Sequence, residues 1–225
     1  MKIKTVNSGN EDYVYIFSRS ERFWIKGGVL VNCNTNTNTL TVRIPKGVTV
    51  IGEEAFFLTS VVRVLMPETV AEIQSYAFKM CKSLRTVRLP KSLQKIGKGA
   101  FSQCKSLKRI RLPQKLTIIN DMAFFNCSSL ISISIPNSVT HIGSSAFSWC
   151  FKLQEVILPD SLTEIGKGAF ERCESLKRIT IPDSVIKIER DAFKSCHPEF
   201  IMFGKHGSEA ERYAGENGIA FEEMK

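Results

Sequence analysis

Six of the seven cysteines stand at a constant interval of 23 residues: Cys81, Cys104, Cys127, Cys150, Cys173 and Cys196. Fixed self-similarity of this kind is the sequence signature of a solenoid, in which each repeat forms one turn and stacks on the next. The 225 residues are 43% hydrophobic and 24% charged, the ordinary balance of a folded globular protein. The spacing therefore predicts a single continuous stack of short structural units.

Two further residue types keep the same frame. The dipeptide Ala-Phe and a single proline recur with the cysteines, at Ala55, Ala77, Ala100, Ala123, Ala146, Ala169 and Ala192 and at Pro45, Pro67, Pro90, Pro113, Pro136, Pro159 and Pro182. The first interval between prolines is 22 residues, because one residue is missing between Phe56 and Val61, where a cysteine would stand. Seven repeats therefore occupy residues 45–203.

One unit can be followed from Pro90 to Pro113. Its last residues, Arg109–Leu112, alternate polar and apolar side chains, which predicts a half-buried strand that the next proline ends. A second short extended segment is expected at Leu93–Ile96. The segment Lys98–Cys104, with Ala and Phe at its centre, predicts a short helical or 3₁₀ turn on the opposite side. Stacked units would bury one continuous core.

The recurring residues, LxxVxLPxxLxxIGxxAFxxCxSL, resemble the BspA-like leucine-rich repeat family across residues 45–203. The resemblance implies an α/β solenoid, a right-handed superhelix with a parallel strand stack on its concave face and short helical or irregular segments on its convex face. It also implies a microbial surface or secreted adhesin-type protein that binds a host or cell-surface protein or glycan. A non-enzymatic interaction module is the function expected from it.

Residues 1–44 are expected to be amino-terminal capping strands. Gly27–Val31 and Leu40–Pro45 have strand character, and the Asn/Thr run Asn32–Thr39 between them predicts a turn. Such a cap is needed because an uncovered terminal repeat would expose an apolar face and a strand edge.

Residues 204–225 are expected to form a helical cap at the other end, continuous with the repeats in one structural domain. Ser208 and Glu211 have capping-box spacing and Gly218 marks the stop. Ile219 and Phe221 would then lie along the open end of the core.

No catalytic or cofactor-binding signature is present, so no enzyme activity, cofactor or metal is expected. The chain has no nucleophile elbow, HExxH, phosphate-binding GxxxxGK[ST] or dinucleotide GxGxxG in the required context. The cysteine series offers no paired CxxC, and His141, His197 and His206 do not accompany it. We interpret the cysteines as small buried side chains that fill one interior position in every turn.

The outward positions of the strands are where a ligand should bind, because they do not hold the core together. Six candidate ligand-binding residues lie there: Arg43, Arg63, Arg88, Arg109, Arg111 and Arg178. With a net charge of +9, this strip suits bidentate contacts with carboxylate, sulfate or phosphate of an acidic protein or glycan. A solvated charged face is the competing interpretation. Nucleic acid is a less favoured partner, because aromatic residues for stacking do not accompany the arginines.

The cellular location is inferred from the family resemblance and from the first residues of the sequence. No run of about 18 apolar residues is present and residues 1–10 lack the apolar core of a signal peptide. The resemblance implies a cell-surface or secreted protein whose export signal is removed or of another kind. A cytoplasmic protein is the alternative.

Overall fold

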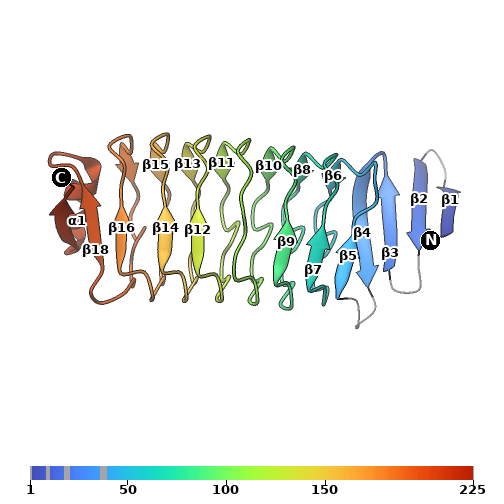
Figure 1. Ribbon diagram of the computed structural model, residues 1–225, viewed down its shortest axis with the longest axis horizontal. Coiled ribbons are helices and arrows are strands. Elements are labelled where there is room, and N and C mark those ends of the chain that lie inside the picture. Colours follow the sequence, from blue (N-terminus) through green and yellow to red (C-terminus); the bar gives the residue numbers. More distant parts are fainter. Residues whose placement is uncertain (1, 9–10, 18–20, 36–39, 225) are drawn as a thin grey trace.

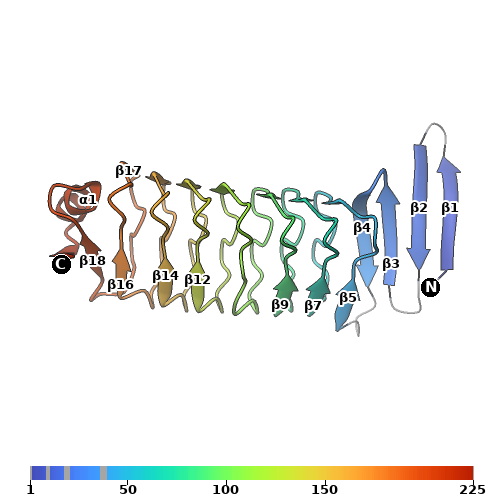
Figure 2. The same cartoon turned by 45° about the horizontal axis from the view of Figure 1, so that its top comes forward.

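The computed structural model describes residues 2–8, 11–17, 21–35 and 40–224. The chain forms a parallel β-solenoid of about eight turns, and Figures 1 and 2 show these turns side by side in a long row. An antiparallel sheet lies at the amino-terminal end of the row and the helix α1 (Glu209–Asn217) at the other. The expected solenoid with parallel strands is confirmed, but the molecule is mostly β, so the α/β class overstated its helix.

Four antiparallel strands form the amino-terminal end: β1 (Lys2–Ser8), β2 (Glu11–Phe17), β3 (Glu21–Lys26) and β4 (Val29–Thr35). The last of them, β4, pairs in parallel with β6 (Val50–Ile51), which joins this sheet to the first turn of the solenoid. The turn predicted at Asn32–Thr39 is wrong for Asn32–Thr35, because pairing along β3 keeps this segment extended despite its asparagines. Residues 36–39 lie outside the described part of the chain.

A first row of parallel strands runs along one side, and its outward surface is named the strand face here. Its members are β5 (Thr41–Arg43), β7 (Arg63–Leu65), β9 (Thr86–Arg88), β12 (Ser132–Ser134), β14 (Glu155–Ile157), β16 (Arg178–Thr180) and β18 (Ile201–Gly204), and β19 (Ala220–Glu223) pairs with β18 at the end. The middle residue of each three-residue strand is buried, as Val87 is, and its neighbours point outward. This alternation is the one expected from the sequence.

A second row of strands follows the proline of each turn. It contains β6, β8 (Glu72–Ile73), β10 (Lys95–Ile96), β11 (Ile118–Ile119), β13 (His141–Ile142), β15 (Glu164–Ile165) and β17 (Lys187–Ile188). The corner between the rows is closed by a backbone hydrogen bond, such as the one from the Leu93 N–H to the Pro90 carbonyl at 3.2 Å. In every one of these strands the second residue, an isoleucine, is buried in the core.

The third side of the solenoid, named the turn side here, consists of tight turns. The helical or 3₁₀ segment predicted at Lys98–Cys104 is therefore wrong. Two residues in each turn have left-handed backbone, as Gly99 (φ 59°) and Gln103 (φ 60°) do, and this conformation ends any right-handed helix. Alternate backbone N–H groups bond to the neighbouring turn, as the Phe101 N–H does with the Ala123 carbonyl at 2.9 Å, and those between them bond within their own turn.

A stack of buried phenylalanine rings runs inside the turn side. Phe56, Phe78, Phe101, Phe124, Phe147, Phe170 and Phe193 follow one another with ring centroids 4.6 to 5.6 Å apart. The six repeated cysteines lie beside them, and each Sγ donates to the phenylalanine carbonyl of the preceding turn, at 2.9 Å for Cys81 and 3.3 Å for Cys150. The thiol therefore links neighbouring turns as well as filling the core, because it is a second donor to a buried carbonyl that also accepts a backbone N–H of its own turn.

Both strand rows are interrupted around the third turn (residues 90–112), and the first row is divided again between β14 and β16. The second row divides into separate sheets between β10 and β11, and Arg109–Leu112 keep the predicted burial alternation but form no strand. In the second row, between β10 and β11, the side-chain Nδ2 of Asn120 donates to the Ile96 carbonyl at 2.7 Å. It replaces the backbone donor used at the matching position Gly143. In the first row, Arg111 stands 23 residues after Arg88, and like charges on neighbouring strands weaken their pairing.

The helix α1 lies at the carboxyl-terminal end of the row of turns. It begins after Ser208 and ends at Gly218, whose φ of 63° is left-handed. The expected capping box differs in detail: the Ser208 side chain makes no cap hydrogen bond, and the Glu211 carboxylate accepts from the Gly207 N–H at 2.7 Å. Ile219 and Phe221 are partly buried and pack against the core, where the sequence places them.

Candidate functional site

All six predicted ligand-binding arginines are exposed on the side of the first strand row. Strand register divides them between two columns that run along the solenoid. Thr41 lies opposite Arg63, which lies opposite Thr86, whereas Arg43 lies opposite Leu65, which lies opposite Arg88. Threonine and leucine therefore separate the first three arginines, and the strip is not the unbroken row that the sequence suggests.

The densest group of cations lies where the second turn meets the third. We name it the strand-face cluster: Arg85, Arg88, Lys108, Arg109 and Arg111, all exposed. Neighbouring turns of a solenoid are about 4.8 Å apart, and alternate residues of a strand are about 7 Å apart. Side chains of this length can therefore converge on one anionic group or on several closely spaced ones.

Arg178 lies apart from this cluster. It stands on β16, three turns further along, and the outward positions between are occupied by Ser132, Ser134, Glu155 and Ile157. The structure thus brings Arg88, Arg109 and Arg111 together and leaves Arg43, Arg63 and Arg178 more isolated.

Lysines beside the cluster were not among the predicted site residues. Lys91 and Lys115 follow the prolines of the third and fourth turns, at the corner between the two strand rows, and both are exposed. The outward alternation of the strands could not reveal them, because they lie in the connecting corner. The sequence feature that could have identified these lysines is the complete lack of acidic residues between Glu72 and Asp121.

The six repeated cysteines are held in their neutral thiol form. Burial raises the pKa of the Cys81 thiol from 9.0 to about 11 and those of Cys150 and Cys196 to about 12. Burial also raises the pKa values of Cys104, Cys127 and Cys173. A thiol held neutral is a poor nucleophile and a poor metal ligand. Within the described ranges, no group of three or more His, Cys, Asp or Glu residues is placed to hold a metal ion.

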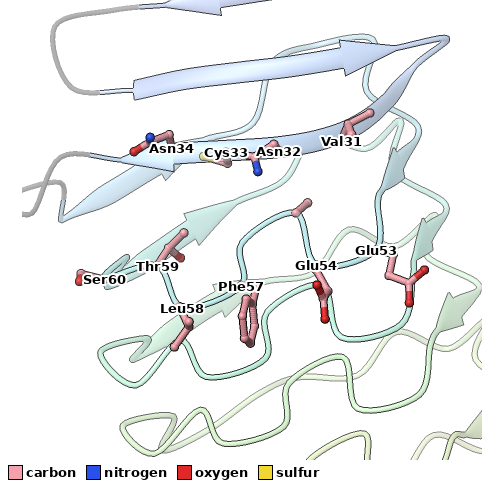
Figure 3. A pocket seen from close by; sticks show the side chains of 11 residues that line it. Val31, Asn32, Cys33, Asn34, Glu53, Glu54, Phe57, Leu58, Thr59 and Ser60 are labelled. Atoms are coloured by element: carbon pink, nitrogen blue, oxygen red, sulfur yellow. The ribbon is translucent and has the colours of Figure 1, made fainter.

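A hollow of about 580 Å³ lies on the turn side, between β4 and the first turn. Figure 3 shows Asn32, Cys33 and Asn34 on β4 above the segment from Glu53 to Ser60. The hollow exists because β4 is an extended strand and does not cover the first turn as another turn would. It carries Glu53 and Glu54 and no cation, so it does not share the chemistry of the strand-face cluster.

A second hollow, of about 420 Å³, lies between the last turn and α1. It is lined by Cys196, His197 and Tyr213, among others. Tyr213 accepts from the Phe193 N–H at 3.4 Å and packs its ring against that of Phe193. These contacts hold α1 against the last turn.

No helix in the described part of the chain has the length and apolar character required to cross a bilayer.

Solved structures with the same fold are bacterial leucine-rich repeat proteins. A leucine-rich cell surface protein from Faecalibacterium prausnitzii is 28% identical, with a TM-score of 0.69, and the match covers 89% of this chain and 54% of that one. A leucine-rich repeat protein from Bacteroides ovatus is 28% identical, with a TM-score of 0.63, and the match covers 89% of this chain and 56% of that one. One from T. pallidum is 28% identical, with a TM-score of 0.64 and coverage of 86% and 89%. The chain thus spans about half the length of the first two proteins.

The sequence itself matches one repeat family. No curated protein matches it significantly. The description of the matching family is BspA type leucine rich repeat region, in six copies, over residues 31–150 and 104–218. Repeats of this kind are typically scaffolds for protein interaction rather than enzymes. The match extends over most of the chain, and the chain therefore belongs to the BspA-type leucine-rich repeat family.

Proposed function

We propose that the chain is a non-enzymatic binding module of a microbial surface or secreted protein, and that its strand face holds an acidic protein or glycan. The proposal rests on one observation: Arg88, Arg109 and Arg111 are exposed on neighbouring turns, with no acidic residue within the cluster. A rigid parallel stack presents these side chains at fixed intervals. Preorganised cations lose less conformational freedom on binding than cations on a mobile loop.

Arginine is the residue best suited to this role. Its planar guanidinium donates two parallel hydrogen bonds to a carboxylate, sulfate or phosphate, which a lysine ammonium cannot do. Three of the five cluster cations, Arg88, Arg109 and Arg111, are among the six arginines that the sequence predicts as ligand-binding residues. Binding of an acidic group there would add charge-assisted hydrogen bonds without any change in the fold.

Nucleic acid is the second candidate, and the net charge of +9 favours it. Its phosphates would satisfy the same guanidinium groups. Single-stranded nucleic acid also needs exposed aromatic rings for its bases, and the cluster contains none. The affinity for a nucleic acid falls steeply with added salt, because each neutralised phosphate releases a counterion. A protein partner held by fewer charges would lose less affinity over the same range.

The experiment compares the wild type with an Arg88→Glu, Arg111→Glu variant against immobilised matrix proteins, sulfated glycans and nucleic acids. A Lys152→Glu, Lys167→Glu variant is the matched control, because it changes the net charge equally at exposed positions away from the strand face. We expect the first variant to lose about tenfold or more in affinity, equivalent to about 1.4 kcal/mol, and the control to lose under twofold. Binding to no acidic partner, or equal binding by both variants, contradicts the proposal.

A further inference from the structure

The basic residues are distributed very unevenly along the chain. Residues 73–120 contain twelve lysines and arginines and no aspartate or glutamate, which leaves 19 basic and 22 acidic residues elsewhere. The whole positive excess of the protein therefore comes from this segment. We name it the basic belt, with these members: Lys79, Lys82, Arg85, Arg88, Lys91, Lys95, Lys98, Lys105, Lys108, Arg109, Arg111 and Lys115.

The belt cations are exposed and nearly all lack a carboxylate partner. Eleven of the twelve are exposed, and Lys79 is partly buried. Among the described residues, Lys95 is the belt member with an ion pair, its Nζ lying 2.8 Å from Glu72 Oε1 at the edge of the belt. Several cations nearer the carboxyl terminus are paired: Lys187 with Glu164 and Glu189, and Arg212 with Glu209 and Glu216. The belt is thus a local excess of charge that the fold itself does not neutralise.

The structure departs from its regular pattern at the same place. Among the described residues, the joint between the third and fourth turns is where both strand rows are interrupted, whereas between β14 and β16, outside the belt, the first row alone is divided. The spacing of the phenylalanine stack is also largest there, with 5.6 Å between the Phe101 and Phe124 centroids. Repulsion among unpaired cations on neighbouring turns opposes close pairing of the strands. A ligand that neutralised these charges would remove this repulsion and so stabilise the folded chain.

The ligand must be anionic and poor in apolar or aromatic groups. Within the belt, Ile118 is the exposed large hydrophobic side chain, and the Tyr76 ring is covered by the Lys79 ammonium at 4.7 Å. Tight protein interfaces depend on aromatic or apolar anchors at their centre, and single-stranded nucleic acid depends on stacking. The belt offers neither, but it offers cations about 5 to 7 Å apart, which suits closely spaced sulfates and carboxylates.

We propose that the basic belt, at its strand-face and corner positions, is the binding site for a sulfated linear polysaccharide. Arg85, Arg88, Lys108, Arg109 and Arg111 would contact it from the strand face, and Lys91 and Lys115 from the adjoining corner. The inference rests on the proposed function and deepens it, because it names the ligand class and confines the site to the second, third and fourth turns. It leaves Arg43, Arg63 and Arg178 outside the site.

Heparin is the probe, and fully desulfated heparin, polyglutamate and duplex DNA are compared with it by calorimetry at two salt concentrations. An Arg88→Gln, Arg109→Gln, Arg111→Gln variant tests the strand face, and a Lys91→Gln, Lys115→Gln variant tests the corner. The control is Arg43→Gln, Arg63→Gln, Arg178→Gln, which removes three charges from the same face outside the belt. Each variant counts as folded when its urea transition is cooperative and its midpoint is no lower than that of wild type.

We expect heparin to bind wild type, the first variant to lose about tenfold or more in affinity and the second severalfold, and the control to lose under twofold. Desulfated heparin should bind at least tenfold more weakly than heparin. Equal losses in the belt and control variants overturn the inference, as does tighter binding of DNA or polyglutamate than of heparin. If polyglutamate alone binds and needs the strand-face arginines, the proposed function survives and this inference fails. If no anionic probe binds, both fail.

Discussion

The buried cysteines make the stability of the protein sensitive to alkali. Each repeated thiol is neutral in the folded chain, with pKa values of about 11 for Cys81 and about 12 for Cys150 and Cys196. The same thiols titrate near 9.0 when they are exposed. Between these values the unfolded chain releases protons that the folded chain retains. Their contribution is therefore fully present below about pH 9 and is lost as the pH rises toward the folded-state values.

The size of this loss follows from the number of thiols. Raising the pH from 7.5 to 9.5 should remove about 1 kcal/mol of unfolding free energy for each thiol whose folded pKa lies well above that range. Six repeated cysteines together would remove about 6 kcal/mol. That is a large part of the roughly 5 to 15 kcal/mol that stabilises an ordinary domain.

Urea unfolding followed by circular dichroism, at pH 7.5 and pH 9.5 with reductant present, measures the loss as a fall in the midpoint. A Cys150→Ala variant provides the control: it should be less stable at both pH values, but its pH-dependent loss should be about 1 kcal/mol smaller than that of wild type. A midpoint that does not move between the two pH values would refute the reasoning. So would a Cys150→Ala variant that keeps the full pH-dependent loss.

Three further results are expected. Replacing Phe124 by alanine should cost about 3 to 5 kcal/mol in urea unfolding, since its ring stacks on neighbours 5.6 and 5.3 Å away; a loss below about 1 kcal/mol would mean that the stack is not a principal source of stability. Gly97→Ala places a Cβ 2.6 Å from the Ser75 nitrogen and should lower the free energy of unfolding by about 1 to 3 kcal/mol. Gly215→Ala, in the helix with no atom within 4 Å of the added Cβ, should raise it by about 0.5 to 1 kcal/mol. Melting temperatures that rank the two variants in the other order would contradict this. A thiol-specific disulfide reagent at pH 8 should leave the five fully buried repeated cysteines, Cys81 to Cys173, unmodified in the native protein and modify all seven cysteines in denaturant; rapid native labelling of Cys127 would show that the core opens readily.

The repeat arrangement could be predicted from the sequence because side-chain type and spacing determine it. Prolines mark the corner after each first-row strand, and the Ala-Phe pairs and cysteines identify the buried positions of the turn side. The turns themselves could not be predicted in the same way. Their left-handed positions are occupied by residues as different as Tyr76, Met122 and Trp149, and glycine occurs at few of them, as at Gly99. Hydrogen bonds between neighbouring turns impose that conformation, and they exist only once the stack has formed.

The candidate site was predictable only in part. Alternation along Arg109–Leu112 correctly indicates which side chains point outward. Proximity depends on register, which follows the repeat interval of 22 or 23 residues and cannot be seen from the alternation within one strand. Arg43 and Arg88 share a column with Leu65 between them, and Arg178 lies three turns from the cluster. Reading each strand alone also missed Lys91 and Lys115, since corner residues follow no alternation.

The interruption around the third turn has a mechanical consequence. When the two ends of the chain are pulled apart, the turns must separate one from another, and the joint between the third and fourth turns lacks the ladder of the second row. That joint is held on the turn side by hydrogen bonds such as that from the Gly99 N–H to the Asp121 carbonyl at 2.9 Å. In an optical trap it should therefore yield first and at the lowest force, leaving two shorter stacks that rupture later. Under tension the long row of turns behaves as two rods joined by a softer link.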